Sequence, residues 1–176
     1  MSASNSESTP LFGFLRVTDL GGPGLIGGYL LLNLLGRPLE FHCTEPVKPN
    51  RAQQILYGDV LEAYLYGEQI AQTLVTHSRL QPSLILTDQP AVLSLRDRSE
   101  LPVVLVAPAQ TPERAPSSLS ASTPIAAAGC TVWISNQDAA HEPAVRETLA
   151  QLSTGWNLME PFRRIEDAVS ELQKAA

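Results

Sequence analysis

Alternation of apolar and polar side chains predicts three strands in series near the start of the chain. In the third, Leu39, Phe41 and Cys43 alternate with polar residues, as in a strand that buries one face. Segments rich in Gly and Asn separate the strands and suit tight turns. We therefore expect three consecutive antiparallel strands. They cover residues 12–19, 29–32 and 39–44.

A long helical segment follows. Asn50 and Gln53 have the spacing of a capping box, so the helix is expected to begin after Asn50. Apolar residues then recur at helical spacing to about Thr76. Two Tyr-Gly pairs, ending at Gly58 and Gly67, interrupt this pattern. The pattern predicts either one kinked helix or two helices nearly in line.

The second half of the chain alternates between strand and helix signals. A short helix beginning at Pro90 lies between two apolar runs, which predicts a βαβ unit with parallel strands. A further strand follows, and then Pro143 and Pro161 each open a helix with one apolar face. The three strands are expected at residues 83–87, 101–106 and 130–135.

These elements indicate one α/β domain with a mixed sheet. Its order is β-β-β-α-β-α-β, followed by a C-terminal strand and two helices. Residues 1–10 are polar and Ser-rich, and we expect a disordered tail there, with the domain over 11–176. A Pro/Ser/Ala-rich stretch at about 108–125 is expected to be a loop.

Charge and cysteine content narrow the class of protein. The chain has 176 residues, 12 Lys and Arg against 18 Asp and Glu, and a formal net charge of −6. Such acidity disfavours nucleic acid as a tight partner. Cys43 and Cys130 are far apart on segments read as buried strands, which favours a reduced, cytoplasmic protein. No apolar run approaches the roughly 20 residues that cross a bilayer, so no membrane partner is expected.

The order of elements over about residues 12–106 resembles the ribonuclease H-like superfamily. Leu15–Asp19 with its Gly-rich turn, the Asn-Arg-Ala after Pro49, and Leu84–Asp88 are similar to that family's first strand, helix start and later strand. The resemblance implies a cluster of carboxylates binding two Mg²⁺ or Mn²⁺ ions, with Asp19 and Asp88 at two of the positions.

The third carboxylate of that family belongs where this chain has Gln53 and Gln54. An amide lacks the negative charge that offsets divalent ions. The resemblance therefore implies a degenerate, non-catalytic member or a distant cousin. Asp138, near the last strand, is a further candidate ligand.

A thiol and imidazole pair is a separate hypothesis. His42 and Cys43 are adjacent in a strand and point to opposite faces, so a reactive Cys43 would need His77 or His141. We interpret Cys43 as a core thiol. The same residues lack the short paired spacing of zinc sites.

Aromatic residues on the helices suggest a surface for a partner. Tyr57, Tyr64, Tyr66 and Phe162 extend the apolar surface of their helices. We expect a non-enzymatic cytoplasmic interaction or assembly protein, with a protein partner or a homo-oligomer and no cofactor.

Two alternatives remain open. One is a Mg²⁺- or Mn²⁺-dependent phosphodiesterase of ribonuclease H-like type with Asp19 and Asp88 as metal ligands. The other is a small-ligand binding module with its pocket near Asp88 and Pro108.

Overall fold

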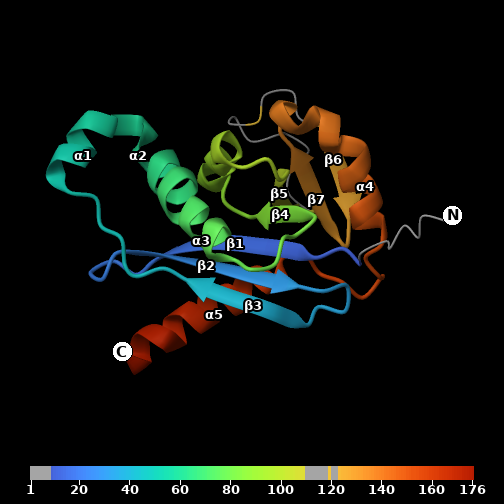
Figure 1. The fold of residues 1–176 in the computed structure, drawn as a ribbon, viewed down its shortest axis with the longest axis horizontal. Coiled ribbons are helices and arrows are strands. Elements are labelled where there is room, and N and C mark those ends of the chain that lie inside the picture. Colours follow the sequence, from blue (N-terminus) through green and yellow to red (C-terminus); the bar gives the residue numbers. More distant parts are fainter. Residues whose placement is uncertain (1–8, 110–118, 120–122) are drawn as a thin grey trace, which may run out of the picture.

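A mixed sheet forms the centre of the molecule (Figure 1). The computed structural model describes residues 9–109, 119 and 123–176. Within these ranges the sheet has seven strands in the order β3-β2-β1-β4-β5-β7-β6. Strands β1, β4 and β5 are parallel, and the other neighbouring pairs are antiparallel. The strands are β1 (Phe12–Asp19), β2 (Leu25–Leu32), β3 (Pro38–Cys43), β4 (Leu84–Thr87), β5 (Val103–Pro108), β6 (Thr123–Ala127) and β7 (Cys130–Ile134). The predicted α/β class and mixed sheet are confirmed.

A series of helices connects β3 to β4, and the type of helix changes along this helical path. The Asn50 capping box is present: Gln53 N–H donates to the Asn50 side chain over 2.8 Å, and Asn50 N–H donates to the Gln53 side chain over 3.0 Å. Gly58 ends the first helix with φ near +50°, which favours glycine. The parts are α1 (Arg51–Tyr57), η1 (Gly58–Val60), α2 (Leu61–Ala63), the π-helical η2 (Tyr64–Ala71) and α3 (Gln72–His77).

Gly67 lets this path lie against the short helix that follows β4. A Cβ added at Gly67 would lie 1.9 Å from the Ser94 hydroxyl oxygen and 2.7 Å from the Leu95 backbone nitrogen. The predicted weak point at Gly67 is therefore a site of close helix packing. The remaining helices are η3 (Pro90–Arg98), η4 (Asn136–His141), α4 (Glu142–Ala150) and α5 (Glu160–Ala175).

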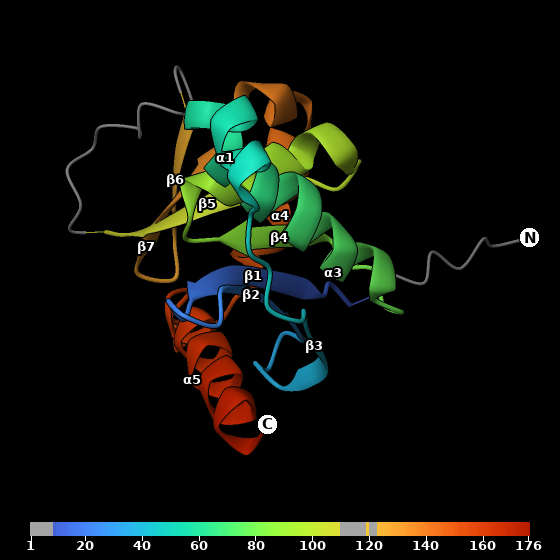
Figure 2. The same cartoon turned by 90° about the vertical axis from the view of Figure 1, so that its left-hand side faces the viewer.

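Helices cover both faces of the sheet. In Figure 2, α5 lies below β1 and β2, and the path from α1 to α3 lies above them. The apolar side chains form one core cluster with α4 and α5 and a second one with η2, α3 and η3. The strands between are buried on both faces, as parallel strands usually are.

Two local expectations need correction. Cys43 is exposed, because it is the last residue of β3, which is the edge strand of the sheet in the described residues. Strand β6 begins at Thr123, inside the stretch expected to be a loop. Most of that stretch, and the expected tail up to residue 8, lie outside the described residues. Over the ranges that are described, no helix combines the length and apolar character needed to span a membrane.

Candidate functional site

Arg16 and Asp88 meet where β1 and β4 run side by side. The two strands are parallel, with Phe14 opposite Leu86, so two residues further on Arg16 comes level with Asp88. Successive side chains alternate between the faces of a sheet, and both residues therefore lie on the face that α5 covers. The Arg16 guanidinium donates from Nη1 to Asp88 Oδ2.

A carboxylate from α5 completes the cluster. Glu166 Oε2 lies 3.4 Å from Arg16 Nη2. Helix α5 presents Phe162, Ile165 and Val169 to the sheet, and Glu166 sits beside that stripe. The side chain of Asp88 is 10% exposed and that of Glu166 49%, so the cluster runs from the interior to the surface. We call Arg16, Asp88 and Glu166 the strand-end cluster.

Two buried atoms of the strand-end cluster have no hydrogen-bond partner among the described residues. They are Arg16 Nε and Asp88 Oδ1. Buried polar atoms are nearly always paired, so an unpaired donor and an unpaired acceptor in one cluster mark places for a polar ligand or water.

Gln89 holds the Asp88 end of the cluster in position. Its side chain accepts from Val17 N–H over 2.7 Å and donates to the Val17 carbonyl over 2.8 Å. An amide side chain thus continues the pairing of β1 and β4 beyond the last residue of β4.

The pKa of Asp88 is raised above its ordinary value. Burial is the main cause, because it disfavours the charged carboxylate, and the charge of Glu166 acts in the same direction. The Arg16 guanidinium opposes both effects. Asp88 therefore gains and loses its proton at a pH closer to neutral than a free aspartate does.

The structure does not bring Asp19 together with Asp88. Asp19 is three residues beyond Arg16 in β1, so it faces the opposite side of the sheet. There it accepts a hydrogen bond from Gly21 N–H over 2.8 Å, and its charge adds to the burial that raises the pKa of Tyr66. Sequence reasoning missed Arg16 and Glu166, although the alternation of β1 already separates Arg16 from Asp19.

Asp138 has a different role from the metal ligand considered from sequence. Its side chain is fully buried. It accepts from Arg96 Nε and, over 3.4 Å, from the Val103 backbone N–H. Asp138 therefore ties η4 to η3 and to the start of β5.

The four aromatic residues expected to bind a partner lie in different parts of the structure. Tyr57 and Tyr64 stack on each other with ring centroids 4.2 Å apart. Tyr66 is partly buried against the second core cluster. Phe162 is 1% exposed and contacts Phe14 edge to face, so it belongs to the core.

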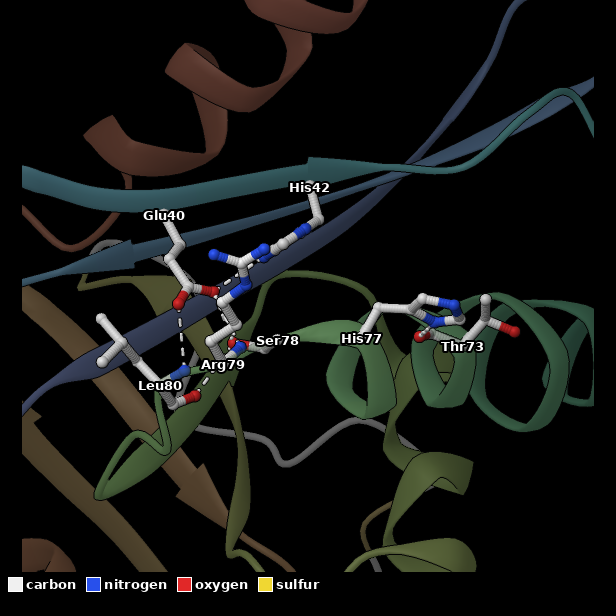
Figure 3. Close-up of polar contacts among 7 residues, drawn as sticks. All are labelled: Glu40, His42, Thr73, His77, Ser78, Arg79 and Leu80. Atoms are coloured by element: carbon white, nitrogen blue, oxygen red, sulfur yellow. Dashed lines mark hydrogen bonds and ion pairs between the residues drawn. The ribbon is translucent and has the colours of Figure 1, made fainter.

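A second polar cluster centres on Glu40 at the sheet edge (Figure 3). Its carboxylate accepts from His42 Nε2 over 2.7 Å and from the Ser78 hydroxyl over 2.9 Å. The backbone N–H groups of Arg79 and Leu80 add bonds of 3.1 and 3.0 Å. These donors favour the ionised form, and they lower the pKa of Glu40 to about 2 despite partial burial. The cluster fastens β3 to the segment after α3.

Acidic pH should weaken the attachment of β3 to the segment after α3. A carboxylate whose pKa falls on folding stabilises the protein above its unfolded pKa, and the gain is lost as pH falls through the folded pKa. Glu40→Gln is expected to be less stable than the parent at pH 7, with the difference vanishing between about pH 5 and pH 2. Urea unfolding at several pH values measures this. Glu45→Gln, an exposed neighbour, is the control, and a pH-independent difference for Glu40→Gln would contradict the expectation.

A cavity of about 490 Å³ next to Glu40 is lined by three of the residues of the thiol hypothesis, without His141. His42, Cys43 and His77 all line it. In the described part of the chain, no hydrogen bond joins the thiol to either imidazole. His42 is bound to Glu40, and His77 Nδ1–H donates to the Thr73 carbonyl over 2.7 Å (Figure 3). The geometry does not form a thiol and imidazole dyad.

The mixed sheet, its strand order and its covering helices define a fold of the ribonuclease H-like type. Solved structures of endonuclease V are among those that it resembles. Human endonuclease V matches with a TM-score of 0.52 and 14% identity, over 96% of this chain and 87% of that one. The enzyme of Ciona intestinalis, in complex with a 24mer DNA containing an inosine followed by a ribo-adenosine, matches with a TM-score of 0.51 and 10% identity, over 95% and 87%. No protein-family model and no curated protein matches the sequence.

These neighbours correct three expectations. The prediction of a non-enzymatic interaction protein is wrong, because the fold is shared with nucleases over nearly the whole chain, and the phosphodiesterase alternative is favoured instead. The expectation of no cofactor is corrected as well, because the ribonuclease H-like resemblance implies divalent ions and the fold is of that type. The view that nucleic acid is disfavoured also conflicts with a neighbour that binds DNA, because net charge describes the whole surface and not one site.

The residues of the strand-end cluster do not fit a divalent cation as they are arranged. In the ranges that the structure describes, no group of three or more His, Cys, Asp or Glu could hold a metal ion. Asp88 and Glu166 offer the oxygen ligands that hard cations prefer, but Arg16 already binds both.

Proposed function

We propose that this chain is a nucleic-acid phosphodiesterase of the endonuclease V type that works at the strand-end cluster. The observation that carries the proposal is the arginine-carboxylate pair at the junction of β1 and β4, with Arg16 Nε and Asp88 Oδ1 both buried and unpaired. The shared fold supports it. The unpaired donor suits a phosphate oxygen, and the unpaired acceptor suits a water molecule.

Arg16 would bind the phosphate of the backbone. A guanidinium presents donors in a planar fork and keeps its charge at any working pH. The carboxylates hold the Nη atoms, so the guanidinium is oriented before a phosphate arrives. A fixed positive charge beside the phosphorus stabilises the charge that develops in the transition state.

Asp88 would act as the general base. Its free Oδ1 takes a proton from the attacking water, whose oxygen bonds to phosphorus as the bond to the leaving sugar oxygen breaks. The leaving oxygen is protonated from solvent, which reaches the cluster at Glu166. The base must be ionised to accept a proton, and burial raises the pKa of Asp88. As the pH is lowered, the cleavage rate is therefore expected to fall at a higher pH than it would with an ordinary aspartate as the base.

The test is a cleavage assay on a DNA oligonucleotide containing an inosine followed by a ribo-adenosine. It is run with Mg²⁺ or Mn²⁺ and, separately, with a chelator, so that the cation requirement is measured. We expect the parent to cleave and Asp88→Asn to be slower by about 100-fold, the scale of a lost general base. Asp59→Asn changes an exposed carboxylate in η1 that is not part of the strand-end cluster, and this variant should cleave at the parental rate. Absence of cleavage by the parent under every condition, or an unchanged rate in Asp88→Asn, would overturn the proposal.

A further inference from the structure

The cavity of about 490 Å³ beside Glu40 lies at the edge of the sheet that β3 forms. Its lining comes from the end of β3, the segment 44–47 that follows it, and the helices η2 and α3. Those helices cover the sheet face opposite α5 (Figure 2), so the cavity is separate from the strand-end cluster. Pockets that bind small molecules have volumes in this range. We call it the edge cavity.

Three polar side chains in the lining already use a hydrogen within the chain. The Thr73 hydroxyl donates to the Gln69 carbonyl over 2.7 Å. His77 Nδ1–H donates to the Thr73 carbonyl over 2.7 Å, and His42 Nε2–H donates to the Glu40 carboxylate over 2.7 Å (Figure 3). A carbonyl and a carboxylate only accept, so each of these hydrogens lies on the ring nitrogen that faces them. The other ring nitrogen of each neutral imidazole is therefore an acceptor.

Gln69 supplies a buried acceptor in the same lining. Its side-chain Oε1 has no hydrogen-bond partner among the described residues. Buried polar atoms are nearly always paired, so this oxygen marks a place for a donor that the described chain does not supply. Gln69 and Ile70 belong to the π-helical η2, and π-helical turns are frequent at functional sites.

The charge of the lining favours the same kind of ligand. Glu45 contributes a carboxylate, and neither lysine nor arginine is among the described residues that line the edge cavity. Ile70, Leu74 and Val47 add apolar surface. A small molecule that donates hydrogen bonds, carries a positive charge and has an apolar part matches this combination.

We propose that the edge cavity binds a small organic amine. Its ammonium group is held by the acceptors of the lining, Gln69 and Glu45 among them, and its apolar part rests on Ile70 and Leu74. An ammonium group has three N–H donors and no acceptor, which suits a lining rich in acceptors. An organic acid would instead meet the Glu45 carboxylate without a lysine or arginine to offset the repulsion. The inference goes beyond phosphodiester cleavage and does not depend on it.

The Cys43 thiol reports whether the edge cavity is filled, because it is exposed and lines the cavity. Its alkylation by iodoacetamide is followed by mass spectrometry in the presence of phenethylamine, phenethyl alcohol or phenylpropanoate, which differ mainly in charge. Phenethylamine at about twice its dissociation constant is expected to slow alkylation about threefold, because occupancy follows mass action. The alcohol and the carboxylate should leave the rate unchanged at the same concentration.

Variants of the lining assign the effect to its acceptors. In a nuclear magnetic resonance titration, Gln69→Leu is expected to weaken phenethylamine binding about tenfold, the scale of a hydrogen bond to a charged group. Glu45→Gln should weaken it about threefold, the scale of an exposed ion pair. Glu62→Gln changes an exposed carboxylate in α2 that does not line the edge cavity, and this control should bind phenethylamine as the parent does.

Three results would overturn the inference. They are protection of Cys43 by none of the three probes, protection by phenethyl alcohol or phenylpropanoate equal to that by phenethylamine, and parental phenethylamine affinity in Glu45→Gln and Gln69→Leu. If Gln69→Leu does not fold, Glu45→Gln decides alone, since Glu45 is exposed. No nucleic acid is present, so a protein that cleaves DNA without binding the amine would refute this inference and leave the proposed function standing.

Discussion

Replacing Asp138 with alanine is expected to lower the free energy of unfolding by about 3–5 kcal/mol, the range for breaking a buried ion pair by removing one partner. The Asp138 side chain is fully buried, whereas that of Arg96 is 18% exposed. Without the carboxylate, the Arg96 guanidinium keeps the Ser99 carbonyl as its acceptor among the described residues, and the Val103 N–H loses its side-chain acceptor. Urea unfolding followed by circular dichroism measures the loss.

Two comparisons separate the ion pair from a general sensitivity of this region. Asp97→Ala, on the exposed side of η3, should change stability by no more than about 0.5 kcal/mol. Arg96→Ala combined with Asp138→Ala should cost less than the two single changes added together, because the double variant leaves neither charge unpaired. A loss below about 1 kcal/mol for Asp138→Ala would place it among ordinary surface changes and contradict the expectation.

Local patterns were sufficient for most of the elements. The alternation in β1 and β3, the capping box at Asn50 and the prolines that open α4 and α5 act within a few residues of each other. Such signals are visible in the sequence because the physical interaction is itself short in range. The predicted βαβ unit is also confirmed, since β4 and β5 are parallel neighbours separated by η3.

The site required information that local patterns lack. Arg16 and Asp88 are 72 residues apart, and only the register of β1 against β4 shows that Arg16, and not Asp19, is level with Asp88. Asp138 was a candidate ligand from sequence because its partner, Arg96, lies 42 residues away along the chain. The exposure of Cys43 likewise follows from the strand order, which makes β3 an edge.

Phe162 illustrates a further limit of sequence patterns. An apolar stripe on a helix looks the same whether it packs inside the domain or on a partner. In the structure the stripe of α5 covers β1 and β2, and Phe162 contacts Phe14 with ring centroids 5.4 Å apart. Phe14 in turn stacks on Trp156 at 6.4 Å, so Phe162 is one member of an aromatic group in the core.

Phe162→Ala is therefore expected to lower the free energy of unfolding by about 3–5 kcal/mol, the usual cost of truncating a buried phenylalanine. The cost combines lost burial, an unfilled cavity and a lost edge-to-face pair. Leu172→Ala on the same helix is the control: Leu172 is 47% exposed, and its removal should cost less than about 1 kcal/mol. Similar costs for the two variants in urea unfolding would contradict the assignment of Phe162 to the core.

Phe162 also connects the core to the strand-end cluster. Glu166 is one helical turn beyond Phe162 on α5, and the packing of that stripe sets how close Glu166 lies to Arg16. If Glu166 and Asp88 together orient Arg16, a loosened α5 should reduce phosphodiester cleavage at temperatures where Phe162→Ala is still folded. Leu172→Ala should cleave at the parental rate under the same conditions. A folded Phe162→Ala with parental cleavage would mean that Asp88 and Gln89, which belong to the β4 end of the cluster, position Arg16 without help from the helix.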